Sequence, residues 1–115
     1  MSTILSETDR AALMANGRKT RDGIDHDPMP VVKLFTPDGA CTWLLSELDP
    51  DQPDLAFGLC DLGLGYPELG TVSLGELEAL RGPLGLPIEC DLHFHPDKTL
   101  GAYADAAIDA GRVIA

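Results

Sequence analysis

The sequence has few positive charges, and this shortage narrows the range of partners. Only 8 lysines and arginines stand against 19 acidic residues, so the formal net charge is -11. Proteins that bind nucleic acid do so largely with basic patches that neutralise phosphates, and this chain has too few basic residues for one. We therefore expect no direct binding to nucleic acid and a protein as the partner. The same acidity is also typical of an ordinary soluble surface.

Cysteines and long apolar runs are also scarce. Cys41, Cys60 and Cys90 are an odd number and form no Cys-x-x-Cys pair, which argues against a disulfide scaffold and favours a reducing compartment. No apolar run approaches the roughly 18 residues that cross a membrane. The first ten residues lack the basic start and apolar stretch of a secretory signal. We expect a protein of the bacterial cytoplasm with no membrane partner.

The motifs of common enzyme classes are missing as well. No serine lies in a Gly-x-Ser-x-Gly context, and no Walker-type Gly-Lys-Ser/Thr or dinucleotide-binding glycine pattern is present. Only 5% of the residues are aromatic, so a large aromatic-rich interface is not expected either. The sequence contains no complete set of catalytic residues, and a non-enzymatic protein with no cofactor is favoured.

The patterns that are present predict a single α+β domain. Residues 1–29 read as an N-terminal helix and a polar linker, 30–96 as the core, and 97–115 as a C-terminal helix. The first helix begins near Ser6, whose hydroxyl can accept a free backbone amide, and is expected to end at Gly17. Apolar spacing predicts the last helix over Leu100–Ala110, capped by Gly111. At this length one modest hydrophobic core is expected.

Short runs of β-branched and apolar residues, separated by turn signals, predict an antiparallel meander. Ser73 to Glu76 matches a capping box and predicts a short helix after the fourth strand. The fold class is therefore α+β, a small antiparallel sheet of four to five strands with two to three helices packed on one face or at its ends. The predicted strands cover Val31–Phe35, Cys41–Leu48, Leu55–Leu62, Glu68–Val72 and Ile88–His95.

The last predicted strand carries the one candidate site for a metal. Its residues alternate strictly between apolar and ionisable, and successive strand side chains point to opposite faces. His93 and His95 would then leave one face together with Asp91, and zinc accepts such a mixture of nitrogen and oxygen ligands. The other interpretation is the solvated face of a half-buried sheet, which is polar for that reason alone. A zinc site is thus the alternative to a protein without a cofactor.

A rigid connector links the short helix to this strand. Gly82 and Gly85 give the backbone freedom, and Pro83 and Pro87 stiffen it, so helix and strand meet at a fixed angle. The connector could also present Arg81 and Glu89 to a partner, and these two residues are the candidate interaction surface.

Several segments resemble a family called domain-of-unknown-function family 2958. The resemblance spans about residues 30–96 and is most specific in the run Arg-Gly-Pro-Leu-Gly-Leu-Pro-Ile-Glu. The other matching segments are Val32–Asp38, Thr42-Trp43, Glu68–Gly70 and Ser73–Glu78. It implies a small α+β domain encoded largely on bacterial plasmids and other mobile elements, and it supplies no catalytic residues.

The acidity, the lack of catalytic motifs and the resemblance together favour one function. We expect an accessory protein of mobile elements, a non-enzymatic acidic module that binds a host or plasmid protein. Counter-defence and nucleic-acid mimicry are specific versions of this hypothesis. The alternative is a small metal-binding or metal-dependent hydrolase domain that uses His93 and His95.

Overall fold

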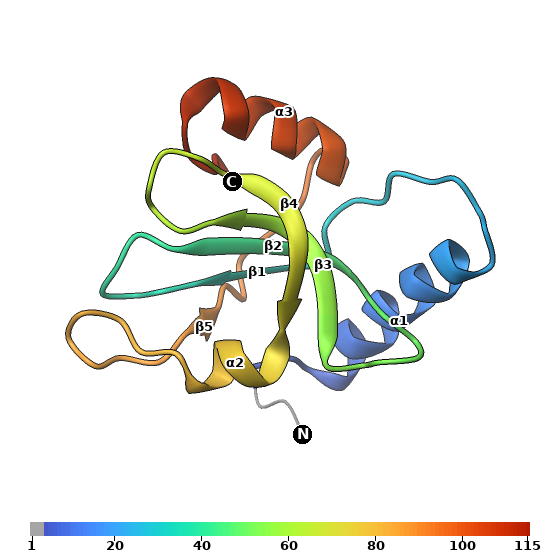
Figure 1. Ribbon diagram of the computed structural model, residues 1–115, viewed down its shortest axis with the longest axis horizontal. Coiled ribbons are helices and arrows are strands. Elements are labelled where there is room, and N and C mark those ends of the chain that lie inside the picture. The colour runs from blue at the N-terminus through green and yellow to red at the C-terminus, as the bar shows by residue number, and fades with distance from the viewer. Residues whose placement is uncertain (1–3) are drawn as a thin grey trace.

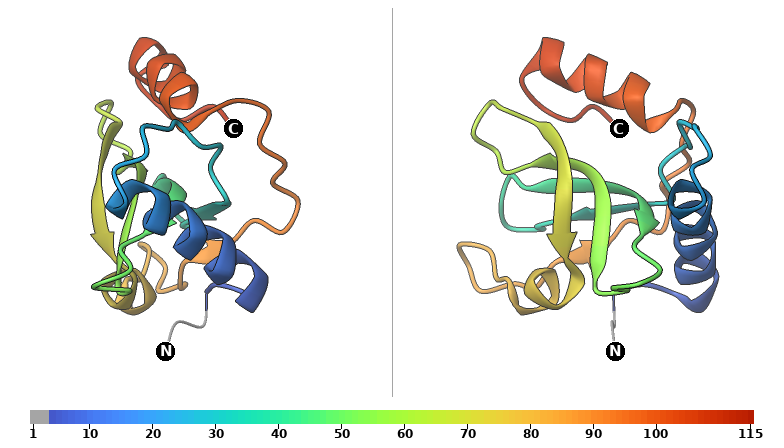
Figure 2. Two further views of the ribbon diagram at one scale, coloured as in Figure 1. Left: turned by 90° about the vertical axis from the view of Figure 1, so that its right-hand side faces the viewer. Right: turned by 45° about the vertical axis from the view of Figure 1, so that its right-hand side comes forward.

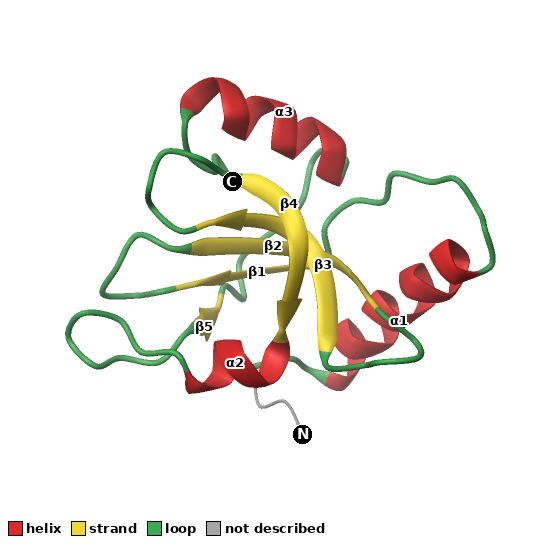
Figure 3. Ribbon diagram, in the orientation of Figure 1, coloured by secondary structure: helices red, strands yellow, loops and turns green. Residues whose placement is uncertain are grey.

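The computed structural model describes residues 4–115 as a five-stranded antiparallel sheet with three helices (Figures 1 and 3). The α+β fold class predicted from the sequence is confirmed. The elements in chain order are α1 (Glu7–Arg21), β1 (Val32–Phe35), β2 (Thr42–Leu48), β3 (Leu55–Asp61), β4 (Glu68–Ser73), α2 (Leu74–Ala79), β5 (Glu89–Cys90) and α3 (Leu100–Ala110).

The sheet has the strand order β4-β3-β2-β1-β5, and every neighbouring pair is antiparallel. The predicted meander of the first four strands is therefore confirmed. Strand β5 adds to the other edge of β1 through two residue pairs only. In Figure 1 the β3–β4 hairpin crosses in front of β1 and β2, so the sheet is strongly bent. The turns that join β1 to β2 and β3 to β4 emerge at the same end of this sheet (Figure 1).

Strand β2 is buried on both faces. Trp43 and Leu45 pack into a cluster with residues of α1 and α2, whereas Leu44, between them, packs against α3. Adjacent strand residues point to opposite faces, so helices cover both faces of the sheet rather than one (Figure 2). A bulge at Ser46 shifts the register between β2 and β3 and leaves the Ser46 carbonyl to accept a hydrogen bond from Asn16 Nδ2 of α1 at 2.9 Å.

Helix α1 begins as the sequence predicts and continues beyond its predicted end. Ser6 Oγ accepts a hydrogen bond from the Asp9 amide at 3.1 Å, which confirms the N-cap. Gly17 lies within the helix, so the prediction that it ends the helix is wrong. A Cβ atom built on Gly17 would lie 1.7 Å from the Leu48 carbonyl oxygen. The glycine therefore lets α1 approach β2 closely, and packing outweighs its low helix propensity.

The strand predicted over Ile88–His95 is wrong beyond Cys90. The Asp91 amide still donates to the Lys33 carbonyl, but the Asp91 carboxylate and carbonyl then accept the amides of His93 and Phe94 at 2.9 and 3.3 Å. This Asx turn bends the chain away from β1 and ends the alternation of faces. Leu92 is consequently 85% exposed.

The predicted capping box at the start of α2 is confirmed in part and extended by a residue from another loop. Ser73 Oγ accepts the Glu76 amide at 3.2 Å. The same hydroxyl donates to the Asp54 carboxylate, which also accepts the Gly75 amide at 2.8 Å. The hydrogen bond from Ser73 lowers the pKa of Asp54 most, and the bond from the Gly75 amide lowers it further, so this pKa lies below its ordinary value.

We expect Gly17→Ala to destabilise the fold by about 1–3 kcal/mol, because the added methyl group collides with the Leu48 carbonyl. Gly75→Ala is the matched control, since its Cβ would lie in ordinary contact, 3.4 Å from Asp54 Oδ1. The helix propensity of alanine should leave that variant as stable as the wild type or more so. Urea denaturation measures both free energies of unfolding. Equal stability of the two variants would contradict the close approach of α1 and β2.

The lowered pKa of Asp54 predicts acid sensitivity. A carboxyl group whose pKa is lower in the folded state stabilises the protein at pH values above its unfolded-state pKa, near 3.8. This stabilisation is lost as the pH falls through the pKa of the folded state. We therefore expect Asp54→Asn to reduce the melting temperature at pH 7 and to flatten its decline below pH 4. Asp109→Asn, on an exposed carboxylate of α3, should keep the wild-type profile. An Asp54→Asn profile parallel to that of the wild type would contradict this assignment.

Candidate functional site

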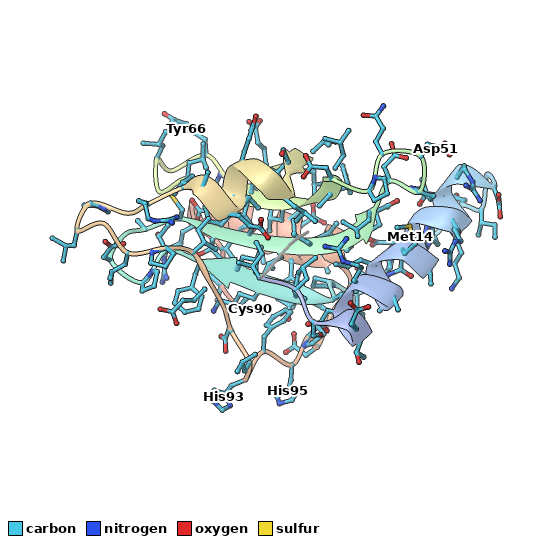
Figure 4. The ribbon with its side chains drawn as sticks, turned by 90° about the horizontal axis from the view of Figure 1, so that it is seen from below. Met14, Asp51, Tyr66, Cys90, His93 and His95 are labelled. Carbon is cyan, nitrogen blue, oxygen red and sulfur yellow. The ribbon has the colours of Figure 1, made fainter. Side chains whose placement is uncertain are left out.

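The histidines of the predicted zinc site lie in the turn after β5. Both are exposed and project from the same side of the molecule (Figure 4). With Asp91 they line a surface cavity of about 460 Å³. The Asp91 carboxylate already accepts the His93 amide and lies 3.7 Å from Lys33 Nζ. Within residues 4–115, no group of three or more His, Cys, Asp and Glu side chains could hold a metal ion. The zinc site stays a prediction.

The cysteines of the sheet are poorly suited to act as nucleophiles. Burial raises the pKa of the Cys60 thiol, and the charge of Glu68 raises it further. Burial likewise raises the pKa of Cys90, together with the charges of Asp9 and Asp91. A raised pKa keeps a thiol protonated, whereas nucleophilic cysteines are thiolates.

Arg81 and Glu89, the predicted interaction surface, stand on either side of the α2–β5 connector. The Arg81 guanidinium donates to the carbonyls of Glu78 and Leu80 at 2.9 Å, so it caps the end of α2. Glu89 is exposed in β5, opposite Phe35 of β1. The connector between them, residues 82–88, closes on itself through a bridge between Arg81 and Pro87.

The carboxylate of Asp38, in the β1–β2 turn, holds this connector in place through hydrogen bonds. Its Oδ2 accepts the amides of Leu84 and Leu86 at 2.7 and 3.2 Å. A Cβ atom built on Gly82 would lie 1.7 Å from Asp38 Oδ1, so only glycine leaves room for the carboxylate. Gly85 adopts a φ of 85°, a conformation that favours glycine, at the tip of the connector. One carboxylate thus holds a loop that is remote from it in sequence.

A second carboxylate organises the β3–β4 loop in the same way. Asp61 is buried, and its two oxygens accept the amides of Gly63 and Val113 at 2.8 and 2.9 Å. A Cβ atom on Gly63 would lie 2.7 Å from that of Ala40, so this loop packs against the β1–β2 turn. The β1–β2 turn therefore contacts both the β3–β4 loop and the connector, and all three project at one end of the molecule (Figures 1 and 2).

Large apolar side chains are exposed on the two outer loops of this end. Tyr66 is 84% exposed and Leu84 is 81% exposed, and the carboxylates of Asp61 and Asp38 hold these loops at the amides of Gly63 and Leu84. Tyr66 projects on the opposite side of the molecule from His93 and His95 (Figure 4). The exposed apolar residues of these loops, which we call the loop-end patch, are Leu62, Leu64, Tyr66, Leu84 and Leu86.

The sequence patterns predicted the β3–β4 segment as a turn and the connector as a rigid support for Arg81 and Glu89, so the exposed leucines and Tyr66 were missed. A signal was present, because Leu-Gly-Leu-Gly-Tyr-Pro and Pro-Leu-Gly-Leu-Pro place large apolar residues between glycines and prolines. A turn requires the glycines and prolines but not the leucines. Apolar residues in such segments can be buried or exposed, and the structure shows that these are exposed.

Charge is divided unevenly over the fold. Half of the basic residues lie on α1: Arg10, Arg18, Lys19 and Arg21. The chain from residue 34 to residue 80, which includes β2, β3, β4 and α2, has no lysine, arginine or histidine. Its acidic residues are Asp38, Glu47, Asp49, Asp51, Asp54, Asp61, Glu68, Glu76 and Glu78. The part of the molecule that bears the β3–β4 loop is therefore acidic.

A family model described as "Protein of unknown function (DUF2958)" matches residues 4–114, almost the whole chain. The chain belongs to the DUF2958 family. The match to DUF2958 is longer than the resemblance over residues 30–96 and includes α1 and α3. No curated protein and no solved structure matches this DUF2958 chain. In the described part of the chain, no helix is long and apolar enough to cross a membrane.

The hydrogen bonds that Asp38 accepts from the connector can be tested by hydrogen exchange. We expect Asp38→Ala to speed exchange at the amides of Leu84 and Leu86 by about tenfold or more, because hydrogen bonds to a charged acceptor are worth about 1.5–3 kcal/mol. Asp25→Ala, in the exposed segment after α1, is the control and should leave those amides unchanged. Unaltered exchange in Asp38→Ala would show that the connector is held by other contacts.

Proposed function

We propose that this protein is a non-enzymatic, acidic module that binds a basic protein through the loop-end patch. The supporting observation is the exposure of large apolar side chains on two loops that Asp61 and Asp38 hold through the amides of Gly63 and Leu84. Soluble proteins rarely expose apolar residues in a group, and such groups mark sites of protein interaction. Tyr66 is the expected anchor, since tyrosine is enriched among the residues that dominate binding energy.

Preorganisation makes these loops suitable for recognition. Binding by a mobile loop costs conformational entropy, and that cost is reduced when the loop is already held in place. The Asp38 and Asp61 carboxylates supply four hydrogen bonds to loop or adjoining backbone amides, at Leu84, Leu86, Gly63 and Val113. The patch can therefore meet a partner without first becoming ordered.

Electrostatics supports a basic partner. The net charge of -11 and the absence of basic residues from 34 to 80 create a negative field around the β3–β4 loop. Such a field accelerates association with a positive surface and disfavours acidic competitors. The resemblance to mobile-element proteins makes a host or plasmid protein in the bacterial cytoplasm the expected source. Nucleic-acid mimicry is one version, in which the acidic residues occupy a phosphate-binding site and the patch adds apolar contacts.

The proposal predicts the residues on which binding of the partner depends. Immobilised wild-type protein should retain a basic protein from a lysate of the host bacterium, and less of it as salt is raised. The double variant Tyr66→Ser/Leu84→Ser should retain at least about tenfold less, because anchor residues each contribute more than about 1 kcal/mol. Quantitative mass spectrometry of the retained proteins measures both effects.

Leu92→Ser is the matched control, since Leu92 is 85% exposed but lies in the turn after β5, outside the patch. It should retain as much partner as the wild type. Circular dichroism verifies that each variant is folded. Equal retention by the double variant, or no specific retention by the wild type, would contradict the proposal.

A further inference from the structure

In the described part of the chain, strand β4 is an edge of the sheet, with no strand paired beyond it. It pairs with β3 on one side, and the strand order ends there. Its pairing with β3 runs over six residues without a register shift. Proteins usually shield edge strands with prolines, lysines or bulges, and β4 contains none of these from Glu68 to Ser73. A Cβ atom built on Gly70 would meet no described atom within 4 Å, so the face of the sheet at the middle of the strand is open.

A cavity of about 390 Å³ lies between this strand and α2. Thr71, Val72 and Ser73 of β4 line it, and Trp43 of β2 lies beneath them. Its remaining walls are mostly aliphatic, with one carboxylate, and consist of Leu55, Leu62, Glu76, Leu77 and Leu80. This lining suits the aliphatic stem and positive head of a lysine or arginine, because such side chains bury their methylene groups and keep the charge at a polar rim.

We propose that β4 accepts an extended segment of the basic partner as an added strand, with one side chain of that segment in the cavity. This inference rests on the proposed function and identifies how the partner binds. Added strands gain affinity from backbone hydrogen bonds and specificity from pockets for alternate side chains. The cavity is continuous with the loop-end patch, because Leu62 belongs to both.

Charge favours a basic segment over a second copy of this chain. Two copies would each bring a net charge of -11, so pairing β4 with a second copy would bring together two surfaces of the same sign. A segment that alternates lysine with apolar residues instead meets Glu68 and Glu76 with opposite charge.

A titration of the isotope-labelled full chain, followed by NMR, tests the added strand. The probe is a synthetic seven-residue peptide that alternates lysine and valine. We expect shifts at the amides of residues 68–73 and at the indole N–H of Trp43. Two control peptides, one with glutamate in place of lysine and one with alternate backbone nitrogens methylated, should bind at least tenfold more weakly. Glu76→Gln should weaken the lysine peptide at least threefold, whereas Glu47→Gln, on β2, should not.

Three results would overturn the added strand. One is equal binding of the methylated peptide, and another is the absence of shifts at residues 68–73 with any peptide. The third is a dimer in light scattering that the lysine peptide dissociates, which would identify a second copy as the occupant. None of these results affects the retention experiment with Tyr66→Ser/Leu84→Ser, so failure here is distinguishable from failure of the proposed function.

Discussion

The burial of β2 on both faces is the constraint on which the rest of the structure depends. Trp43 and Leu45 require cover from α1 and α2, and Leu44 requires cover from α3. A strand that is apolar on both faces cannot be solvated on either, so the chain must supply helices to both sides. The bulge at Ser46 and the glycine at position 17 adapt α1 to this central strand. The loops at the end of the sheet then take positions set by the two hairpins.

Carboxylates give this acidic protein much of its loop structure. Asp38, Asp54 and Asp61 each accept hydrogen bonds from backbone amides in loops or at a helix end. Charged acceptors make stronger hydrogen bonds than neutral ones, and each such bond satisfies an amide that lacks a partner in regular structure. Part of the negative charge of this protein is therefore structural.

Local patterns in the sequence predicted the fold well where a local cause decides the structure. Ser6 begins a helix through its own hydroxyl group, and Gly111 ends α3 in the left-handed conformation. The predictions failed where a distant contact decides. Gly17 reads as a stop until the Leu48 carbonyl is placed beside it, and Leu92 reads as buried until Asp91 turns the chain. The loop-end patch is of the second kind, because Asp38 and Leu84 are far apart in the sequence.

Within the connector, one set of residues determines the path of the backbone and another forms the exposed surface. Its path is set by Gly82, Gly85 and the Asp38 carboxylate, whereas the side chain of Leu84 is 81% exposed. Replacing such a side chain changes the exposed surface and leaves the backbone in place. Under the proposed function, a substitution at Leu84 would change what the connector binds without opposing folding, while Asp38 and the glycines of the connector are constrained by geometry.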